Sequence, residues 1–143
     1  MNRTTLGGIG ALAGIVAIIG AVGSWATYQG AHLNGTDANR GITVAVAAGV
    51  GLLLMLLYAA RGFRWVSALA IVAGAVAFGL TIWSLAKLNS FAGVPSSIHL
   101  GKGWGIWLAL IGSLVLLLAA LAATFMRPAA ATVATPEAPP PAT

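Results

Sequence analysis

Hydrophobic and polar positions follow one another in long blocks along this chain. Four apolar runs, each free of Asp, Glu, Lys, Arg and His, are separated by a polar stretch, a short basic turn and a second polar stretch; they cover residues 6–26, 42–60, 65–86 and 104–126. Each run is close to the roughly 20 residues that a helix needs to cross a hydrocarbon layer about 30 Å thick. The pattern therefore predicts an all-α, polytopic membrane protein with four transmembrane helices in an up-down bundle.

Two loops and a tail complete the predicted organisation. Residues 1–127 form the four-helix transmembrane domain, with one loop after the first helix and another after the third, on the same side of the bundle. Residues 128–143, "PAAATVATPEAPPPAT", are rich in Ala and Pro and cannot bury a core, so we expect a disordered tail. The first run is longer than the roughly 7–15 apolar residues of a secretory signal peptide, so we expect it to be retained as a helix.

Composition and charge are typical of a membrane location. Hydrophobic residues make up 59% of the chain and charged residues only 6%. The net charge of +5 comes from single, scattered Lys and Arg residues, so we expect no nucleic-acid partner. An even number of spans places both termini on one side, and the short turn with Arg61 and Arg64 is typical of a cytoplasmic loop. We therefore expect an inner or plasma membrane protein with cytoplasmic N- and C-termini. Without Cys, the chain has no disulfide and no thiolate nucleophile.

Small residues recur at three- and four-residue spacing in the helices. Because no hydrophobic force drives helices together in lipid, such faces are expected to allow close backbone packing. The predicted packing positions are Gly10, Gly14, Ser67, Gly74, Ala77, Thr81, Gly105 and Gly112. The Leu-rich stretches 52–57 and 114–118 are then expected to face lipid or a partner.

The first polar stretch, "SWATYQGAHLNGTDANRG", is predicted to be a contact surface on the outer side. Asn34-Gly35 is a dipeptide typical of a type I′ turn, which predicts a short hairpin between residues 29–33 and 36–39. We expect Asp37 to cap the second helix or to pair with Arg40. The candidate contact residues of the two outer loops are Tyr28, His32, Asn34, Gly35, Asp37, Arg40 and His99.

The same loops contain the few residues suited to metal binding or catalysis. His32, His99 and Asp37 are the candidate metal ligands, but a catalytic zinc needs three ligands in a fixed geometry, which their spacing does not show. The loop serines lack the surroundings of a nucleophile elbow. The sequence therefore predicts no metal, no cofactor and no enzyme activity.

Transport is the alternative class of function. Secondary transporters and proton pumps generally carry a carboxylate, a His or a broken helix within the membrane, whereas these spans contain isolated hydroxyls and no Pro. A homo-oligomeric channel or a small-molecule efflux component, using the hydroxyl-bearing face of the third helix, stays open as the alternative.

Two segments carry a resemblance to a known group. The outer loop and helix start "WATYQGAHLNGTDANRGITVAVA" and the Gly-rich entry to the fourth helix, "GKGWGIWLALIG", resemble small four-helix membrane proteins from actinobacteria. That group has no established activity, so the resemblance implies the architecture alone. From the residues themselves, we expect a non-catalytic accessory or assembly subunit that contacts lipid and binds a larger membrane protein complex through its helix faces and outer loops; a homo-oligomer is a further expectation.

Overall fold

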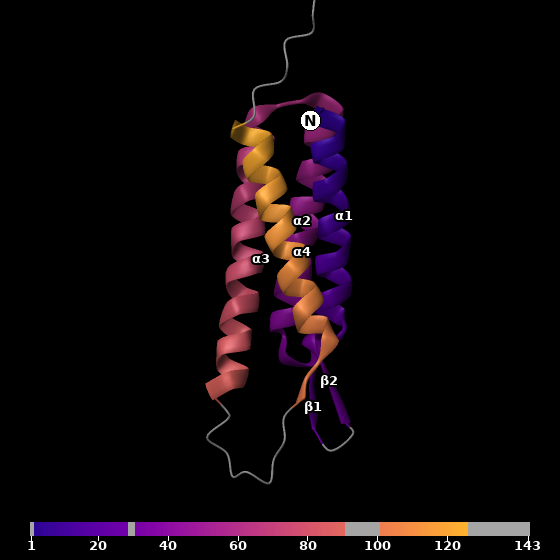
Figure 1. Ribbon diagram of the computed structural model, residues 1–143, viewed down its shortest axis with the longest axis vertical. Helices are drawn as coiled ribbons and strands as arrows, with labels where there is room; N and C mark the ends of the chain where they lie inside the picture. Colours follow the sequence, from indigo (N-terminus) through magenta and orange to yellow (C-terminus); the bar gives the residue numbers. More distant parts are fainter. Residues whose placement is uncertain (1, 29–30, 91–100, 126–143) are drawn as a thin grey trace, which may run out of the picture.

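A computed structural model describes residues 2–28, 31–90 and 101–125 of the chain. Four long helices run side by side in alternating directions (Figure 1). Their bounds are α1 Arg3–Val22, α2 Arg40–Arg61, α3 Arg64–Ser90 and α4 Trp104–Phe125. The all-α, four-helix fold class predicted from the apolar runs is therefore confirmed.

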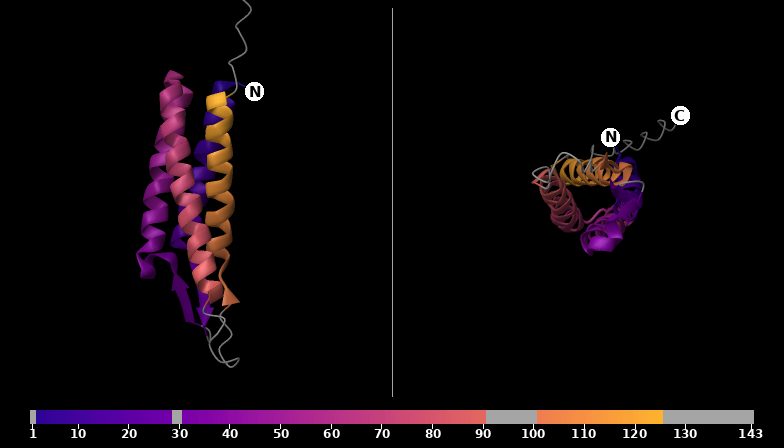
Figure 2. Two further views of the ribbon diagram at one scale, coloured as in Figure 1. Left: turned by 90° about the vertical axis from the view of Figure 1, so that its left-hand side faces the viewer. Right: turned by 90° about the horizontal axis from the view of Figure 1, so that it is seen from below.

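The helices form a closed ring in chain order. Each helix packs against the next one along the chain, and α1 packs against α4 to close the ring (Figure 2). The first turn of α1, the last turn of α4 and the turn between α2 and α3 lie together at one end, which we call the termini end (Figure 1). In that turn Gly62 adopts the left-handed region with φ of 72°, which a glycine tolerates without strain.

All four helices are long and apolar enough to cross a membrane. Each also exposes large apolar side chains around the outside of the ring, for example Leu12, Leu53, Val72 and Leu118. An outer surface of this kind is compatible with a multi-pass membrane protein, because lipid tails are as apolar as these side chains.

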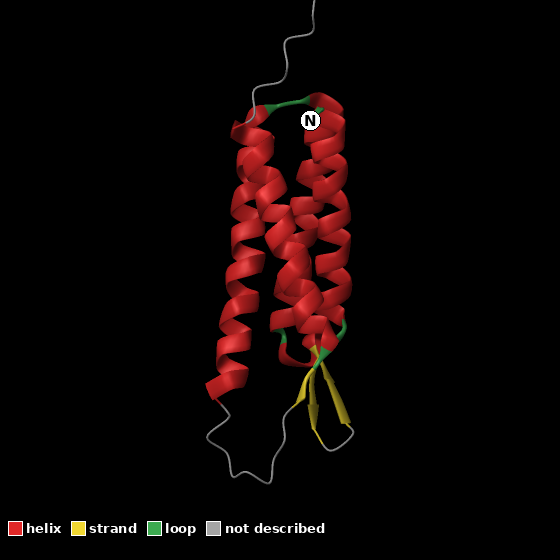
Figure 3. Cartoon of the chain, in the orientation of Figure 1, coloured by secondary structure: helices red, strands yellow, loops and turns green. Residues whose placement is uncertain are grey.

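A small sheet stands at the opposite end, which we call the sheet end (Figure 3). It consists of β1 Ser24–Tyr28, β2 Ala31–Asn34 and β3 Gly101–Lys102, in the antiparallel order β2-β1-β3. A single 3-10 turn, η1 Gly35–Ala38, leads from β2 into α2.

The sheet corrects the predicted end of the first helix, which was placed at residue 26. Gly23 is extended, with ψ of 178°, and its N–H donates to the Ile19 carbonyl at 3.0 Å, so α1 ends at Val22. From Ser24 onward the chain is a strand, and Ala26 pairs with Leu33 on one side and Lys102 on the other. The ladder to these two strands supplies the backbone partners that another helical turn would have supplied.

The predicted hairpin is also wrong in register. The observed hairpin joins β1 to β2, with Tyr28 opposite Ala31, and Asn34-Gly35 lies instead where β2 ends and η1 begins. Among the described residues, positive φ values occur at Asn39 (54°) and Gly62, so Gly35 does not form a type I′ turn. The Asn34 N–H donates to Asp37 Oδ2 at 2.8 Å, which holds η1 in place of the expected turn.

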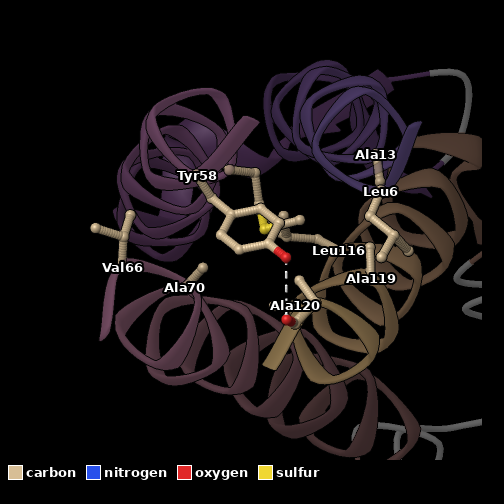
Figure 4. Close-up of a cluster of buried hydrophobic side chains, with 10 residues drawn as sticks. Leu6, Ala13, Tyr58, Val66, Ala70, Leu116, Ala119 and Ala120 are labelled. Carbon is tan, nitrogen blue, oxygen red and sulfur yellow. Dashed lines mark hydrogen bonds between the residues drawn. The ribbon is translucent and has the colours of Figure 1, made fainter. Parts of the chain in front are cut away.

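Two buried clusters fill the ring. The cluster toward the termini end is shown in Figure 4, where the Tyr58 ring lies among side chains from all four helices. The second cluster, toward the sheet end, contains Ala21, Trp25, Val44, Ala77, Ile106 and Ala109.

Burial also corrects the prediction for the Leu-rich stretches. Leu53 and Leu118 are 64% and 54% exposed, as expected for outward-facing residues. Met55 and Leu116, in the same two stretches, are fully buried. Each stretch therefore contributes both to the outer surface and to the core.

Candidate functional site at the sheet end

Trp25 anchors the sheet to the helices. Its side chain is 6% exposed, and its indole Nε1–H donates to the Gly20 carbonyl at 3.0 Å. Gly20 lies in the last turn of α1, where backbone carbonyls have no partner within the helix. The indole therefore satisfies one of these carbonyls and packs its ring into the sheet-end cluster, which fixes β1 relative to α1.

Glycines allow the sheet and the helix starts to approach each other closely. A Cβ on Gly35 would meet the Ala21 carbonyl and the Trp25 ring, and a Cβ on Gly103 would meet the Ser24 carbonyl. Gly41, in the first turn of α2, is held in the same way against Gly35. The backbone contacts leave no room for side chains here, so the sheet lies closely against the ends of the helices. The sequence prediction named Gly35 but did not place Gly41 or Gly103 in these contacts, although each is a glycine at or just before a helix start.

Asp37 and Arg40 do not make the contacts predicted for them. Asp37, in η1, accepts the N–H of Asn34 at the end of β2, and α2 begins without a side-chain cap hydrogen bond. The Arg40 guanidinium lies over the Trp83 ring of α3, with its carbon 5.3 Å from the ring centroid, rather than pairing with Asp37. This cation–π contact joins the start of α2 to the last turns of α3.

The predicted contact residues of the first loop divide into exposed and buried ones. His32, Asn34, Asp37 and Arg40 are exposed, and Gly35 is buried under the Trp25 ring. Sequence reasoning missed Leu33, which lies on β2 and is 49% exposed. The Tyr28 side chain and the whole of His99 lie outside the described residues.

The eight predicted packing residues are all buried between helices. A Cβ on Gly10 would meet Met55, one on Gly14 would meet Leu52, one on Gly74 would meet Leu117, and one on Gly105 or Gly112 would meet the α1 backbone. The sequence prediction omitted Gly20, which lies directly against the backbone of α4.

Hydroxyl groups at two of the packing positions bond within their own helices. The Thr81 hydroxyl donates to the Ala77 carbonyl at 2.8 Å, and the Ser67 hydroxyl donates to the Arg64 carbonyl at 2.8 Å. These bonds satisfy the hydroxyls inside the helices.

The termini end is held by a separate polar network, which sequence reasoning missed. The Tyr58 hydroxyl donates to the Ala123 carbonyl at 3.1 Å, and the Arg64 guanidinium donates to the Thr124 carbonyl at 3.0 Å. The Thr124 hydroxyl also reaches the Ser67 hydroxyl at 2.9 Å. Since the last carbonyls of α4 lack partners within that helix, donors from α2 and α3 satisfy them, and the Arg64 charge is favourable at a helix C-terminus.

Exposed groups at the sheet end come from β2, η1 and the neighbouring ends of α2 and α3. In the described ranges, three or more His, Cys, Asp or Glu side chains do not gather anywhere in a group that could hold a metal ion. The sheet end presents a strand edge, exposed polar side chains and the contact between Arg40 and Trp83. Comparisons with family models, with curated proteins and with solved structures find no match to this chain.

Proposed function

We propose that the protein is a non-catalytic accessory or assembly subunit that binds a larger membrane protein complex through the free edge of β2. The observation that carries this proposal is the position of β2 at the edge of the sheet, beside β1 and with no further strand beside it among the described residues. An edge strand presents unpaired N–H and C=O groups, to which an extended segment of a partner can add as a further strand.

Two features make β2 better suited to this role than β3. It has four residues and β3 has two, so it offers the longer edge even though the Asn34 N–H already donates to Asp37. Its side chains His32, Leu33 and Asn34 are exposed and include one large apolar group. The glycine contacts and Trp25 already hold the sheet in place, so binding costs little further ordering of the chain.

Leu33→Lys is expected to reduce recovery of the partner about tenfold, which corresponds to roughly 1.4 kcal/mol of binding free energy. A charge on a strand edge disfavours addition of another strand, and the apolar contact of Leu33 is lost as well. The measurement is the amount of partner that co-purifies in mild detergent with the full chain, normalised to the membrane-inserted protein.

Phe63→Lys is the matched control, because Phe63 is 48% exposed and lies at the termini end. It adds the same charge at an apolar position of nearly equal exposure and should leave partner recovery unchanged. Equal recovery from both variants and the parent would remove the β2 edge from the interface, whereas a homogeneous ring of this chain alone would favour the oligomeric channel instead.

The orientation we propose places the termini end in the cytoplasm of the cell membrane. Arg3, Arg61 and Arg64 are at this end, and two of them are in or beside the short turn between α2 and α3. Short loops rich in Arg and Lys are retained on the cytoplasmic side. The sheet and its free β2 edge would then face outward.

Cysteine labelling tests this orientation directly, since the chain contains no Cys. In intact cells, a membrane-impermeant maleimide is expected to label Lys102→Cys on β3 but to label Phe63→Cys only after the membrane is permeabilised. Both positions are exposed, so accessibility of the side chain is matched. Labelling of Phe63→Cys in intact cells, with Lys102→Cys protected, would reverse the proposed topology.

A further inference from the structure

A basic-aromatic cluster lies where α2 begins and α3 ends. Trp83 is 54% exposed, and the Arg40 guanidinium lies over its ring. Lys87 is also exposed and follows Trp83 by four residues in α3, so the two side chains share one face of the helix. One cation therefore lies over the exposed indole, and a second is carried one turn away on the same face of α3.

The apolar surface of α3 continues directly from this cluster. Val76 and Val72 lie about two and three turns from Trp83 toward the termini end, on the same side of the helix, and are 46% and 60% exposed. Between Trp83 and Val76 lies Gly79, where an added Cβ would meet nothing within 4 Å. At Gly79 the helix surface between the indole and Val76 therefore carries no side chain. We call this the bare surface.

From this arrangement we infer that Arg40, Trp83 and Lys87 bind an anionic phospholipid. Its phosphate lies between the two cations, and an acyl chain follows the bare surface at Gly79 toward Val76. This binding is distinct from the proposed pairing at β2 and does not depend on it.

The positive charge of the site and its position at the end of a transmembrane helix both favour a lipid as the occupant. The guanidinium and ammonium groups complement a phosphate, and a Trp at the end of a transmembrane helix sits at the headgroup depth. The one carboxylate near Arg40 in sequence, Asp37, accepts a hydrogen bond from the Asn34 N–H. A soluble anion would contact the two cations alone, whereas a phospholipid would also cover the apolar surface that extends from them toward the termini end.

The test uses the full chain in phosphatidylcholine nanodiscs that contain a small, fixed share of a brominated lipid. Bromine on the acyl chains quenches nearby indoles, and the contribution of Trp83 is the difference between the parent and Trp83→Phe. We expect brominated phosphatidylglycerol to quench Trp83 much more strongly than brominated phosphatidylcholine with the same acyl chains. Equal quenching by the two lipids in the parent would overturn the inference without any further variant.

Variants then assign the preference to the named residues. Arg40→Gln and Lys87→Gln are each expected to weaken the preference for phosphatidylglycerol about fivefold. Gly79→Leu fills the bare surface and should reduce quenching of Trp83 by both lipids. Arg61→Gln, at the termini end, is the matched control and should change nothing at Trp83.

Two further outcomes decide between lipid and free anion. Soluble glycerol phosphate added in excess should leave the quenching unchanged; if it abolishes the preference, the site binds free phosphate groups and the lipid inference fails. Helix content by circular dichroism confirms that each variant is folded. A folded Arg40→Gln/Lys87→Gln double variant that keeps the full preference would also overturn the inference.

Discussion

Gly20→Ala is expected to lower the free energy of unfolding of the bundle by about 1–3 kcal/mol, the range for overpacking a close contact. A Cβ at this position would meet the backbone of α4 at Gly105, Leu108 and Ala109. Backbone atoms cannot move aside as a flexible side chain can, so α1 and α4 must separate. The measurement is unfolding of the detergent-solubilised protein, followed by the loss of helical circular dichroism.

Gly8→Ala supplies a control within the same helix. An added Cβ at Gly8 meets nothing within 4 Å, so the substitution changes helix propensity equally but makes no new contact. Gly10→Ala should fall between the two, because its new Cβ would meet the side chain of Met55, which can rotate away. If the three variants unfold alike, the contact between α1 and α4 is not the one that limits stability.

Trp25→Ala is expected to have a still larger effect, a loss of about 3–5 kcal/mol, because it removes a large buried side chain. The indole fills the sheet-end cluster and donates its Nε1–H to the Gly20 carbonyl. Loss of both should free β1 from α1 and expose the polar stretch from Ser24 onward to proteolysis. Unfolding and limited proteolysis of the same samples measure the two consequences separately.

Two companion variants make the Trp25 result specific. Trp25→Phe keeps an aromatic ring but loses the hydrogen bond, so it should cost less than Trp25→Ala. Trp107→Ala removes the same side chain from an exposed position, 46% exposed on α4, and should leave unfolding nearly unchanged. A Trp25→Ala protein as stable and as protease-resistant as the parent would show that the sheet is held by its glycine contacts alone.

The helices could be predicted because a transmembrane helix requires an apolar run of a certain length, and such runs are visible directly in the sequence. The predicted runs 42–60 and 104–126 differ from α2 and α4 by two residues at most at either end, whereas α3 continues four residues beyond the predicted end at residue 86. The error at the end of α1 arose because Trp25 and Ala26 are apolar in a strand as they would be in a helix. Over so few residues, apolarity does not distinguish a strand from a helix.

The details of the sheet end could not be predicted, for a different reason. Asn34-Gly35 favours a tight turn locally, but in the structure Gly35 packs against Ala21 and Trp25, ten or more residues earlier in the chain. The contact between Arg40 and Trp83 joins residues from separate helices. Such pairings depend on tertiary approach, which local propensity does not contain.

Which residues of the Leu-rich stretches are buried and which are exposed could likewise not be predicted from the sequence. In water, polar residues mark the outward face of a helix, but in lipid both faces are apolar. Leu116 and Leu118 therefore look alike in the sequence, although one is fully buried and the other is 54% exposed. The small residues were more informative, since Gly74 and Gly112 are placed where backbones approach closely.

The contact between α1 and α4 also sets the order in which the protein can be assembled during translation. Gly20 and Gly112 face the partner helix from the first and the last span, so their contacts form only when α4 has been synthesised. At ribosomal rates of about 5–20 residues per second, the glycine face of α1 waits about 5–18 s for its partner. During that interval the face is open to any other helix with a small-residue face.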